Sequence, residues 1–374
     1  MAGFFRRFTK GFFVLCNIFI AILFLLGCYA SHFDPLHFWF IGFFTLASIY
    51  LLLFLLVFMI FWFFAKKKFM LISIIAVLCA WQPLRHLIKF RFGADFRLQK
   101  NDSSLRVMSW NVEHFDILEH KAHPERKLEM IDLVAQYTPD IACFQEVVGN
   151  ETDSTAINYL PFFKQRMQFR EYLYSYNKKL DFDNKHHFGI VIFSRWPILN
   201  RQTISYEPNN YNCIFQYVDI LKGADTFRVF NIHLQSLKFS EANREYIDDP
   251  SMQNERDLER SKNIISKFHT GFLQRKIQSE RIKQAMDASP YPVIVCGDFN
   301  DVPNSYAYST VGKGMKNCFA EKGSGIGRTF YSISPTLRID NIFTDPRFET
   351  TQFVRIKKKL SDHFPIIADL SFNR

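Results

Sequence analysis

The fold of this chain is decided by one short stretch in its C-terminal third, VIVCGDFN, residues 293–300. Its apolar run, closed by Gly297, is typical of a buried strand. Asp298 and Asn300 follow directly, and functional side chains are often placed where a rigid strand passes into a loop. A Gly-Asp-x-Asn sequence is also a common turn, in which the Asp and Asn side chains bond to their own backbone. The stretch therefore predicts a core strand, and the rest of the chain decides whether it ends in a turn or a site.

Five further strand-like runs end in polar residues that a core would not normally contain, at residues 109–113, 144–147, 231–234, 338–343 and 361–365. A single histidine or glutamate in such a place is usually structural or solvated. Six runs of this form in one chain are not independent accidents. Helical spacing is rarer: it occurs at residues 126–137 and in the charged stretch 254–286, which is either a solvated helix or a lid or membrane-facing helix. Many strands with few helices predict two packed sheets with helices outside.

Together these strand ends resemble those of the endonuclease/exonuclease/phosphatase superfamily. That family includes pancreatic-type deoxyribonucleases, apurinic endonucleases, inositol polyphosphate 5-phosphatases and neutral sphingomyelinases. The run GIVIFSRWPI at residues 189–198 also looks like the family's central strand and the turn after it. The resemblance covers residues 105–372 and implies an α/β fold, a four-layered α/β sandwich of two packed mixed sheets with outer helices. The site is then expected at the strand ends.

The resemblance implies catalytic roles for five residues: Asp298, His363, His233, Asp340 and Asn300. Hydrolysis of a phosphate ester needs an activated water, neutralised phosphoryl oxygens and a protonated leaving group. Asp298 is expected to orient or deprotonate the attacking water. Asp340 is expected to fix the tautomer of His363, which would donate to a phosphoryl oxygen.

The resemblance also implies a metal site formed by four residues: Glu146 as the principal ligand, with Glu113, Asn111 and Asp362 beside it. Hard oxygen ligands suit Mg²⁺, with Mn²⁺ as the alternative ion. The expected substrate contacts are Asn111, Asn300, His233 and Arg328. These roles follow from the resemblance, because spacing alone would not assign them.

The basic excess of the chain is confined to its first hundred residues. Residues 1–100 hold 11 Lys and Arg against 2 Asp and Glu, a net charge of +9, whereas residues 101–374 hold 35 against 34, a net charge of +1. Three apolar runs without a charge lie at residues 12–30, 38–65 and 69–84. The first two are long enough to cross a bilayer, and the third is marginal. We therefore expect about three transmembrane helices in residues 1–90, a connector at 91–104 and a catalytic domain at 105–374.

The flanking residues of these runs predict a topology. Trp39, Trp62 and Trp81 lie near run ends, as interface anchors do. Basic residues precede the first run and follow the second, which places the N-terminus and residues 66–68 in the cytoplasm. If the third run crosses, the catalytic domain is extracytoplasmic, and this is the topology we expect for a multi-pass protein of the cell membrane. The alternative is a third segment lying in the interface, with the domain in the cytoplasm.

The sequence thus predicts a membrane-anchored, Mg²⁺-dependent phosphoesterase (class EC 3.1) that hydrolyses a phosphodiester or phosphomonoester by metal-assisted in-line attack of water. A lipid headgroup is favoured as substrate by the spans, the near-neutral domain and an aromatic-rich loop at residues 159–176. The alternative is a nuclease acting on DNA or RNA, which would need a basic groove. A non-catalytic interaction domain on the same fold is the third hypothesis. No protein partner can be inferred.

Overall fold

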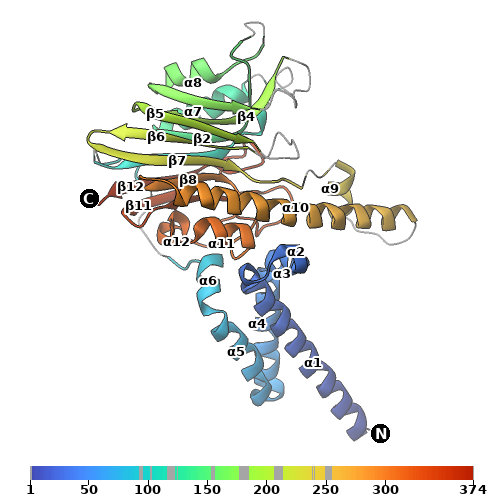
Figure 1. The fold of residues 1–374 in the computed structure, drawn as a ribbon. Helices are drawn as coiled ribbons and strands as arrows, with labels where there is room; N and C mark the ends of the chain where they lie inside the picture. The colour runs from blue at the N-terminus through green and yellow to red at the C-terminus, as the bar shows by residue number, and fades with distance from the viewer. Residues whose placement is uncertain are drawn as a thin grey trace.

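The structure is a computed structural model that describes residues 2–91, 96–101, 103–115, 123, 125–152, 156–176, 185–205, 214–237, 239, 241–248 and 255–373. Within these residues, two six-stranded mixed sheets pack face to face above a group of N-terminal helices (Figure 1). The first sheet has the strand order β11 (Phe348–Arg355), β12 (Ile366–Phe372), β1 (Leu105–Asn111), β2 (Ile141–Gly149), β4 (His187–Ser194) and β3 (Glu171–Tyr176). The second has the order β5 (Ile198–Ser205), β6 (Ile214–Lys222), β7 (Asp225–His233), β8 (Val293–Asp298), β10 (Asp340–Thr344) and β9 (Lys316–Asn317).

Helices cover both outer faces of this pair of sheets. On the first sheet lie α7 (Arg126–Tyr137) and α8 (Leu160–Arg166), and on the second lie α10 (Glu255–Asp287) and α11 (Tyr306–Gly312). Two short helices, α9 (Glu241–Asp248) and α12 (Cys318–Lys322), complete this part. The predicted four-layered α/β sandwich is confirmed.

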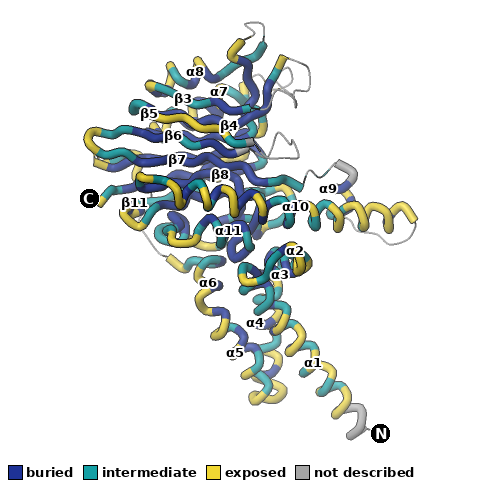
Figure 2. The backbone as a smooth tube through the Cα atoms, in the orientation of Figure 1, coloured by how far each residue is buried: buried dark blue, intermediate teal, exposed yellow. Residues whose placement is uncertain are grey.

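The strand β8 is buried on both faces, as its continuous apolar run predicts. Val293 and Val295 pack with the outer helices, whereas Ile294 and Cys296 pack between the two sheets. Because side chains alternate along a strand, each face of β8 supplies a different core. Figure 2 shows the same burial along the neighbouring strands. The end of β8 is therefore held from both sides.

Several elements differ from the prediction. The aromatic stretch 159–176 is not a loop, because it forms α8 and β3. The strand β4 is not central but lies next to the edge strand β3. The strands β5 and β11 were not predicted, since their sequences ILNRQTIS and FETTQFVR mix polar and apolar residues. Residue 254 lies outside the described residues. The rest of the charged stretch 254–286 belongs to the single helix α10.

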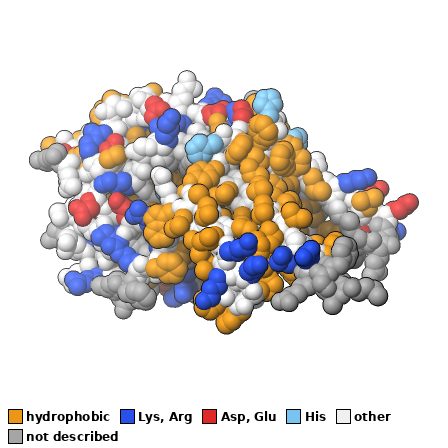
Figure 3. Space-filling model, turned by 90° about the horizontal axis from the view of Figure 1, so that it is seen from below, with side chains coloured by type: hydrophobic (Ala, Val, Ile, Leu, Met, Phe, Trp, Pro, Cys, Tyr) orange, Lys and Arg blue, Asp and Glu red, His pale blue; other side chains and the backbone are white. Residues whose placement is uncertain are grey.

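The N-terminal helices, residues 2–87, are called the membrane segment here because they include helices apolar enough to cross a membrane. They are α1 (Ala2–Cys28), η1 (Ala30–His32), α2 (Pro35–Phe38), α3 (Ile41–Leu46), α4 (Ser48–Ala65), η2 (Lys67–Phe69), α5 (Met70–Cys79) and α6 (Trp81–Leu87). In the described part of the chain, Arg7–Cys28 and Ser48–Ala65 are long and apolar enough to cross a membrane. Lys67–Cys79 and Trp81–Leu87 form a third such element only as a pair, bent by 67°. Figure 3 shows hydrophobic side chains gathered over this segment; the exposed ones include Phe12, Leu15, Phe19, Leu53 and Ile60.

The second predicted span, residues 38–65, contains a helix long and apolar enough to cross a membrane at Ser48–Ala65, but the run is not helical throughout. It is divided into α2, α3 and α4. The hydroxyl groups of Thr45 and Ser48 donate to the carbonyls four residues earlier, and such bonds bend apolar helices. Trp62 is also not an interface anchor, since it is 2% exposed and packs on Phe69.

The sandwich is fastened to the membrane segment by two loops that flank the end of β8. In the loop after β8, Asn304 Nδ2 donates to the Pro83 carbonyl of α6 at 3.1 Å. In the loop before β10, Ser334 Oγ lies 2.9 Å from the Tyr50 hydroxyl of α4. Both loops therefore sit against the same end of the membrane segment.

Candidate active site

The register of the second sheet brings three predicted residues into one row. In the parallel pair β7–β8, His233 lies opposite Asp298. In the antiparallel pair β8–β10, Asp298 lies opposite Asp340. Residues opposite each other on neighbouring strands present their side chains to the same face. Three separate strand ends thus deliver His233, Asp298 and Asp340 to one place.

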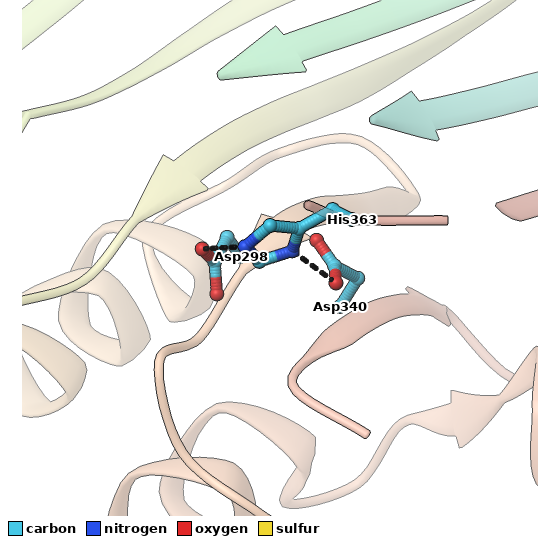
Figure 4. Close-up of side chains that lie close together, drawn as sticks. All are labelled: Asp298, Asp340 and His363. Atoms are coloured by element: carbon cyan, nitrogen blue, oxygen red, sulfur yellow. Dashed lines mark hydrogen bonds and ion pairs between the residues drawn. The ribbon is translucent and has the colours of Figure 1, made fainter. Parts of the chain in front are cut away.

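His363 reaches this row from the first sheet. Its Nδ1 lies 2.8 Å from Asp340 Oδ2, and its Nε2 lies 3.7 Å from Asp298 Oδ2. Figure 4 shows the ring between the two carboxylates. The His363 backbone is held by Ser361 Oγ, which accepts its N–H at 3.0 Å, and by Trp110 Nε1, which donates to its carbonyl at 3.0 Å. The imidazole therefore has a fixed position with one nitrogen committed to Asp340.

The electrostatics of the row favour a charged imidazole. Burial alone would lower the pKa of His363, but the carboxylates of Asp340, Asp298 and Asp362 outweigh it and hold that pKa well above its ordinary value. Burial raises the pKa of Asp298, and the charge of His363 opposes this shift. The protonated ring and the carboxylates thus stabilise each other in a buried place.

The turn after β8 is built by Asp298 and Asn300 together. Asp298 Oδ1 accepts the Asn300 N–H at 2.8 Å. Asn300 Nδ2 donates to the Leu234 carbonyl at 3.0 Å and to Asp298 Oδ2 at 3.3 Å. Both donor hydrogens of the Asn300 carboxamide are therefore engaged in holding the turn, and a phosphate could be bound only by releasing one of them. Asn300 has φ 48°, a left-handed conformation that asparagine tolerates better than most residues.

Glu146 lies beside the row because of an irregularity in β2. The register of β2 against β4 shifts between Phe144 and Val147, and Glu146 has φ 54°. Such bulges redirect a side chain, here toward two imidazoles. Glu146 Oε1 lies 3.7 Å from His233 Nε2, and Oε2 lies 3.6 Å from His114 Nε2. Burial raises the Glu146 pKa to about 7, and the charge of Asp362 adds to this shift.

The other predicted ligands form a chain of hydrogen bonds next to Asp298. Asn111 Nδ2 donates to Asp298 Oδ2 at 3.2 Å, and Asn111 Oδ1 accepts the Glu113 N–H at 3.2 Å. Glu113 Oε2 in turn accepts the Asp362 N–H at 2.9 Å. Asn111, Glu113 and Asp362 are thus brought together with the row of His233, Asp298 and Asp340.

Arg328 is not brought to the row in the same way. Its Nη2 donates to the Tyr331 carbonyl at 2.6 Å, so its guanidinium serves the loop before β10. The structure instead adds His114, which the sequence analysis did not single out. Its Nε2 is buried without a hydrogen-bond partner and its ring packs on Phe188 at 4.9 Å. The only sequence signal is its place directly after Asn111-Val112-Glu113.

The donor set fits a divalent cation. Asp298, Asp340 and His363 each offer a ligand atom within 4.8 Å of the others, but the bond from His363 Nδ1 to Asp340 already occupies two of these groups. The charge of Asp362 adds to the rise in the pKa of Glu146, and a cation bound to Glu146 would oppose this repulsion. Carboxylate and amide oxygens are the ligands that Mg²⁺ and Mn²⁺ take.

Comparison with known proteins points to one family. A family model described as "Endonuclease/Exonuclease/phosphatase family" matches residues 108–363, and a second, described as a domain of unknown function, matches residues 10–87. No curated protein sequence matches the chain.

Solved structures share the fold. An endonuclease/exonuclease/phosphatase family protein from Bacteroides thetaiotaomicron is 19% identical with a TM-score of 0.51, covering 72% of this chain and 98% of its own. The human Nocturnin catalytic domain with bound sulfate anion is 16% identical with a TM-score of 0.51, covering 72% of this chain and 94% of its own.

Proposed function

The chain belongs to the endonuclease/exonuclease/phosphatase family, and we propose that it is a membrane-anchored, divalent metal-dependent hydrolase of phosphoric esters. Members of this family are generally phosphoester hydrolases that use divalent ions. The observation that carries the proposal is the meeting of His233, Asp298 and Asp340 in one row, with His363 bonded to Asp340 at 2.8 Å.

Two histidine nitrogens of the site converge on one carboxylate oxygen of Asp298. His233 Nε2 and His363 Nε2 lie 3.6 and 3.7 Å from Asp298 Oδ2, which is too far for direct hydrogen bonds. Asp298 accepts a proton from the attacking water and orients it. His363, held protonated by Asp340, donates a hydrogen bond through Nε2 to a phosphoryl oxygen. His233 contacts the same phosphate and assists the leaving group, whose oxygen takes up a proton as its bond to phosphorus breaks. Asn300 holds the turn that carries Asp298 and, with Asn111, borders the substrate.

Glu146 is the principal metal ligand in this proposal, with Asn111, Glu113 and Asp362 around it. A bound Mg²⁺ or Mn²⁺ would polarise the phosphoryl group and neutralise its charge. The ring of His114 beside Glu146 Oε2 supports a place for the ion on that side of the carboxylate.

Anchoring rests on α1 and α4, with the α5–α6 pair as a third, bent crossing. We assign residues 1–90 to the membrane segment, 91–104 to the connector and 105–374 to the catalytic domain. The N-terminus and the turn between α4 and α5 lie at the end of the segment away from the sheets (Figure 1). That end carries Lys66, Lys67 and Lys68. Because basic residues favour the cytoplasmic side, the catalytic domain is extracytoplasmic.

A lipid phosphoester is the favoured substrate. The two loops that flank the end of β8 both contact the membrane segment, through Asn304 and Ser334. A site held beside the bilayer can reach lipid headgroups while the lipid stays in the membrane. Arg328 lies in the loop before β10 and remains a proposed substrate contact, which requires its guanidinium to leave the Tyr331 carbonyl.

The proposal is tested with the full chain in nanodiscs and Mg²⁺ or Mn²⁺, using plasmid DNA, sphingomyelin, phosphoinositides and a bis-aryl phosphodiester. Asp298→Asn protein is the matched control. Turnover of a lipid supports the favoured substrate, and nicking of DNA with strong salt dependence and no lipid turnover replaces it with a nuclease. Failure to hydrolyse any of them, with intact folding, leaves only an interaction domain.

The side of the membrane is tested by an alkaline-phosphatase fusion after residue 104. An active fusion supports the extracytoplasmic domain. An inactive but stable fusion moves the domain to the cytoplasm.

A further inference from the structure

One face of α10 is shared between the membrane segment and solvent. Positions 258, 265, 269, 272 and 276 follow one another at helical spacing and lie on the same side of the helix. The inner three contact the membrane segment. His269 packs on Trp39 at 4.9 Å, Phe272 on Phe43 at 5.8 Å, and Lys276 Nζ lies 3.9 Å from Asp34 Oδ1. This face of α10 therefore looks toward the membrane segment.

The outer two positions on the same face are large apolar residues left open. Leu258 is 46% exposed and Ile265 is 47% exposed. They lie on the half of α10 that carries its N-terminus, and Figure 1 shows this half extending beyond the sandwich, crosswise to α1 and α4. The helix α9 packs next to this face, because the Tyr246 hydroxyl lies 2.7 Å from Ser261 Oγ, between Leu258 and Ile265 in the helical sequence.

The depth of α10 relative to the proposed bilayer follows from its contact with α3. Phe43 belongs to α3, which ends at Leu46, and the span α4 begins at Ser48. A helix packed on α3 thus lies at the end of a membrane-crossing element, where headgroups begin. Neighbouring Leu36 and Phe38 are 51% and 44% exposed on the same short connection between spans. Apolar side chains are therefore open at this level on both elements.

We infer that the N-terminal half of α10 lies on the bilayer surface around the spans, with Leu258 and Ile265 buried at the boundary between headgroups and acyl chains. This rests on the proposed anchoring by α1 and α4. The occupant is the lipid layer, because the exposed Leu258 and Ile265 lie on the same side of α10 as its contacts with the membrane segment. An amphipathic helix at this depth buries its apolar face in the interface.

The contact would also hold the active site at a fixed height. The inner half of α10 is bonded to both catalytic strand ends: Arg275 Nε donates to Asp301 Oδ2 at 3.1 Å, and Gln278 Oε1 accepts the Gln235 N–H at 2.8 Å. Asp301 and Gln235 each lie within three residues of the row. A helix resting on the bilayer therefore positions His233 and Asp298 relative to the headgroups.

The inference is tested by depth measurement on the full chain in nanodiscs. An environment-sensitive fluorescent amino acid is introduced singly at Leu258 or Ile265, and at Arg256 or Asn263, which are exposed on the opposite face. A further label at Leu53, exposed on α4, reports the anchoring itself. Nitroxides attached to lipids at shallow and deep positions and a water-soluble quencher are then compared.

We expect shallow lipid nitroxides to quench the labels at 258 and 265 several-fold more than those at 256 and 263, and the aqueous quencher to do the reverse. Equal quenching of all four, with the label at 53 quenched by deep nitroxides, overturns the surface contact while leaving the anchoring intact. A label at 53 that deep nitroxides fail to reach overturns the anchoring and this inference with it.

Discussion

The guanidinium of Arg338 donates to the main-chain carbonyl of His86, in the last turn of α6. The same side chain donates to the Ile326 carbonyl at 2.6 Å and stacks on Phe319. Arg338 stands two residues before Asp340, the carboxylate behind His363. One buried arginine thus ties the end of the membrane segment to a strand of the candidate active site.

Replacing Arg338 with methionine should lower the free energy of unfolding by about 2–4 kcal/mol, because the partly buried carbonyls of His86 and Ile326 lose the donor that the buried Arg338 side chain provides. Thermal unfolding in detergent measures the change. The matched control is Arg347→Met, since Arg347 is exposed and pairs with Asp345 on the surface, where such pairs contribute about 0–1 kcal/mol. Equal effects of the two substitutions would contradict the role of Arg338.

Asp298→Asn and His363→Ala should each reduce turnover by about 10²–10⁴-fold, the usual contribution of a positioned acid or base. Asp298→Asn should not lower the melting temperature of the metal-free protein, whereas His363→Ala should lower it, because the buried Asp340 carboxylate loses its partner. In Asp298→Asn, loss of a buried charge offsets the weaker bond to the Asn300 N–H. A variant that keeps near wild-type kcat would remove that residue from the mechanism.

Glu146→Gln should stabilise the metal-free protein at pH 8. The pKa of Glu146 is raised from 4.5 to about 7 in the fold. The favourable contribution of its protonation is complete below about 4.5 and is lost as pH rises through about 7, which costs about 3 kcal/mol at most. The uncharged variant avoids this loss.

Binding of Mn²⁺ should offset the loss of stability that ionised Glu146 causes at pH 8. Added Mn²⁺ should raise the melting temperature of the wild-type protein more at pH 8 than at pH 5, because the ligand must be ionised. Glu146→Gln should respond little at either pH. A variant that responds like wild type would exclude Glu146 as the principal ligand.

Asp340→Asn should lower the pKa of His363. Burial lowers this pKa and nearby carboxylates raise it, and the variant removes one of those carboxylates. The stability that His363 gains from protonation is present below its ordinary value of about 6.5 and is lost as pH rises through its raised pKa in the fold. In the variant this loss should begin at lower pH, and so should the alkaline fall of kcat/KM. NMR titration of the imidazole measures the shift directly, and an unchanged titration would refute the pairing.

His114→Ala should weaken Mn²⁺ binding by about tenfold, the usual effect of removing a group that orients a ligand. The physical reason is the separation of 3.6 Å between its Nε2 and Glu146 Oε2. Electron paramagnetic resonance of free Mn²⁺ gives the affinity without any substrate. The control is His123→Ala, because His123 is exposed and pairs with Glu125 away from the row.

The strands that could be predicted from the sequence are those with a continuous or regular pattern of apolar residues. Runs such as Val293–Cys296 are apolar on both faces because two cores need them, so their strands were evident in the sequence. Edge strand β5 carries Asn200, Arg201 and Gln202 toward solvent, and a half-solvated strand of that kind resembles a loop.

The site was predictable where a residue follows a recognisable strand. His114 was not, because its partner Glu146 is distant in sequence and is turned toward it by a bulge that no periodicity reveals. The break within residues 38–65 was missed for a similar reason. Length and apolarity predict a span, but the Thr45 and Ser48 hydroxyl bonds that divide it are invisible to hydropathy.

The row of His233, Asp298 and Asp340 has a consequence for how this protein could diversify. Its geometry is a property of strand pairing in the second sheet, where Gly297 lets β7 and β8 approach so closely that a Cβ would lie 2.0 Å from the Ile232 carbonyl oxygen. Loops that choose a substrate can therefore lengthen or be exchanged while the reacting groups keep their spacing. Hydrolysis of a small activated ester should survive such grafts, and preference among natural esters should change with them.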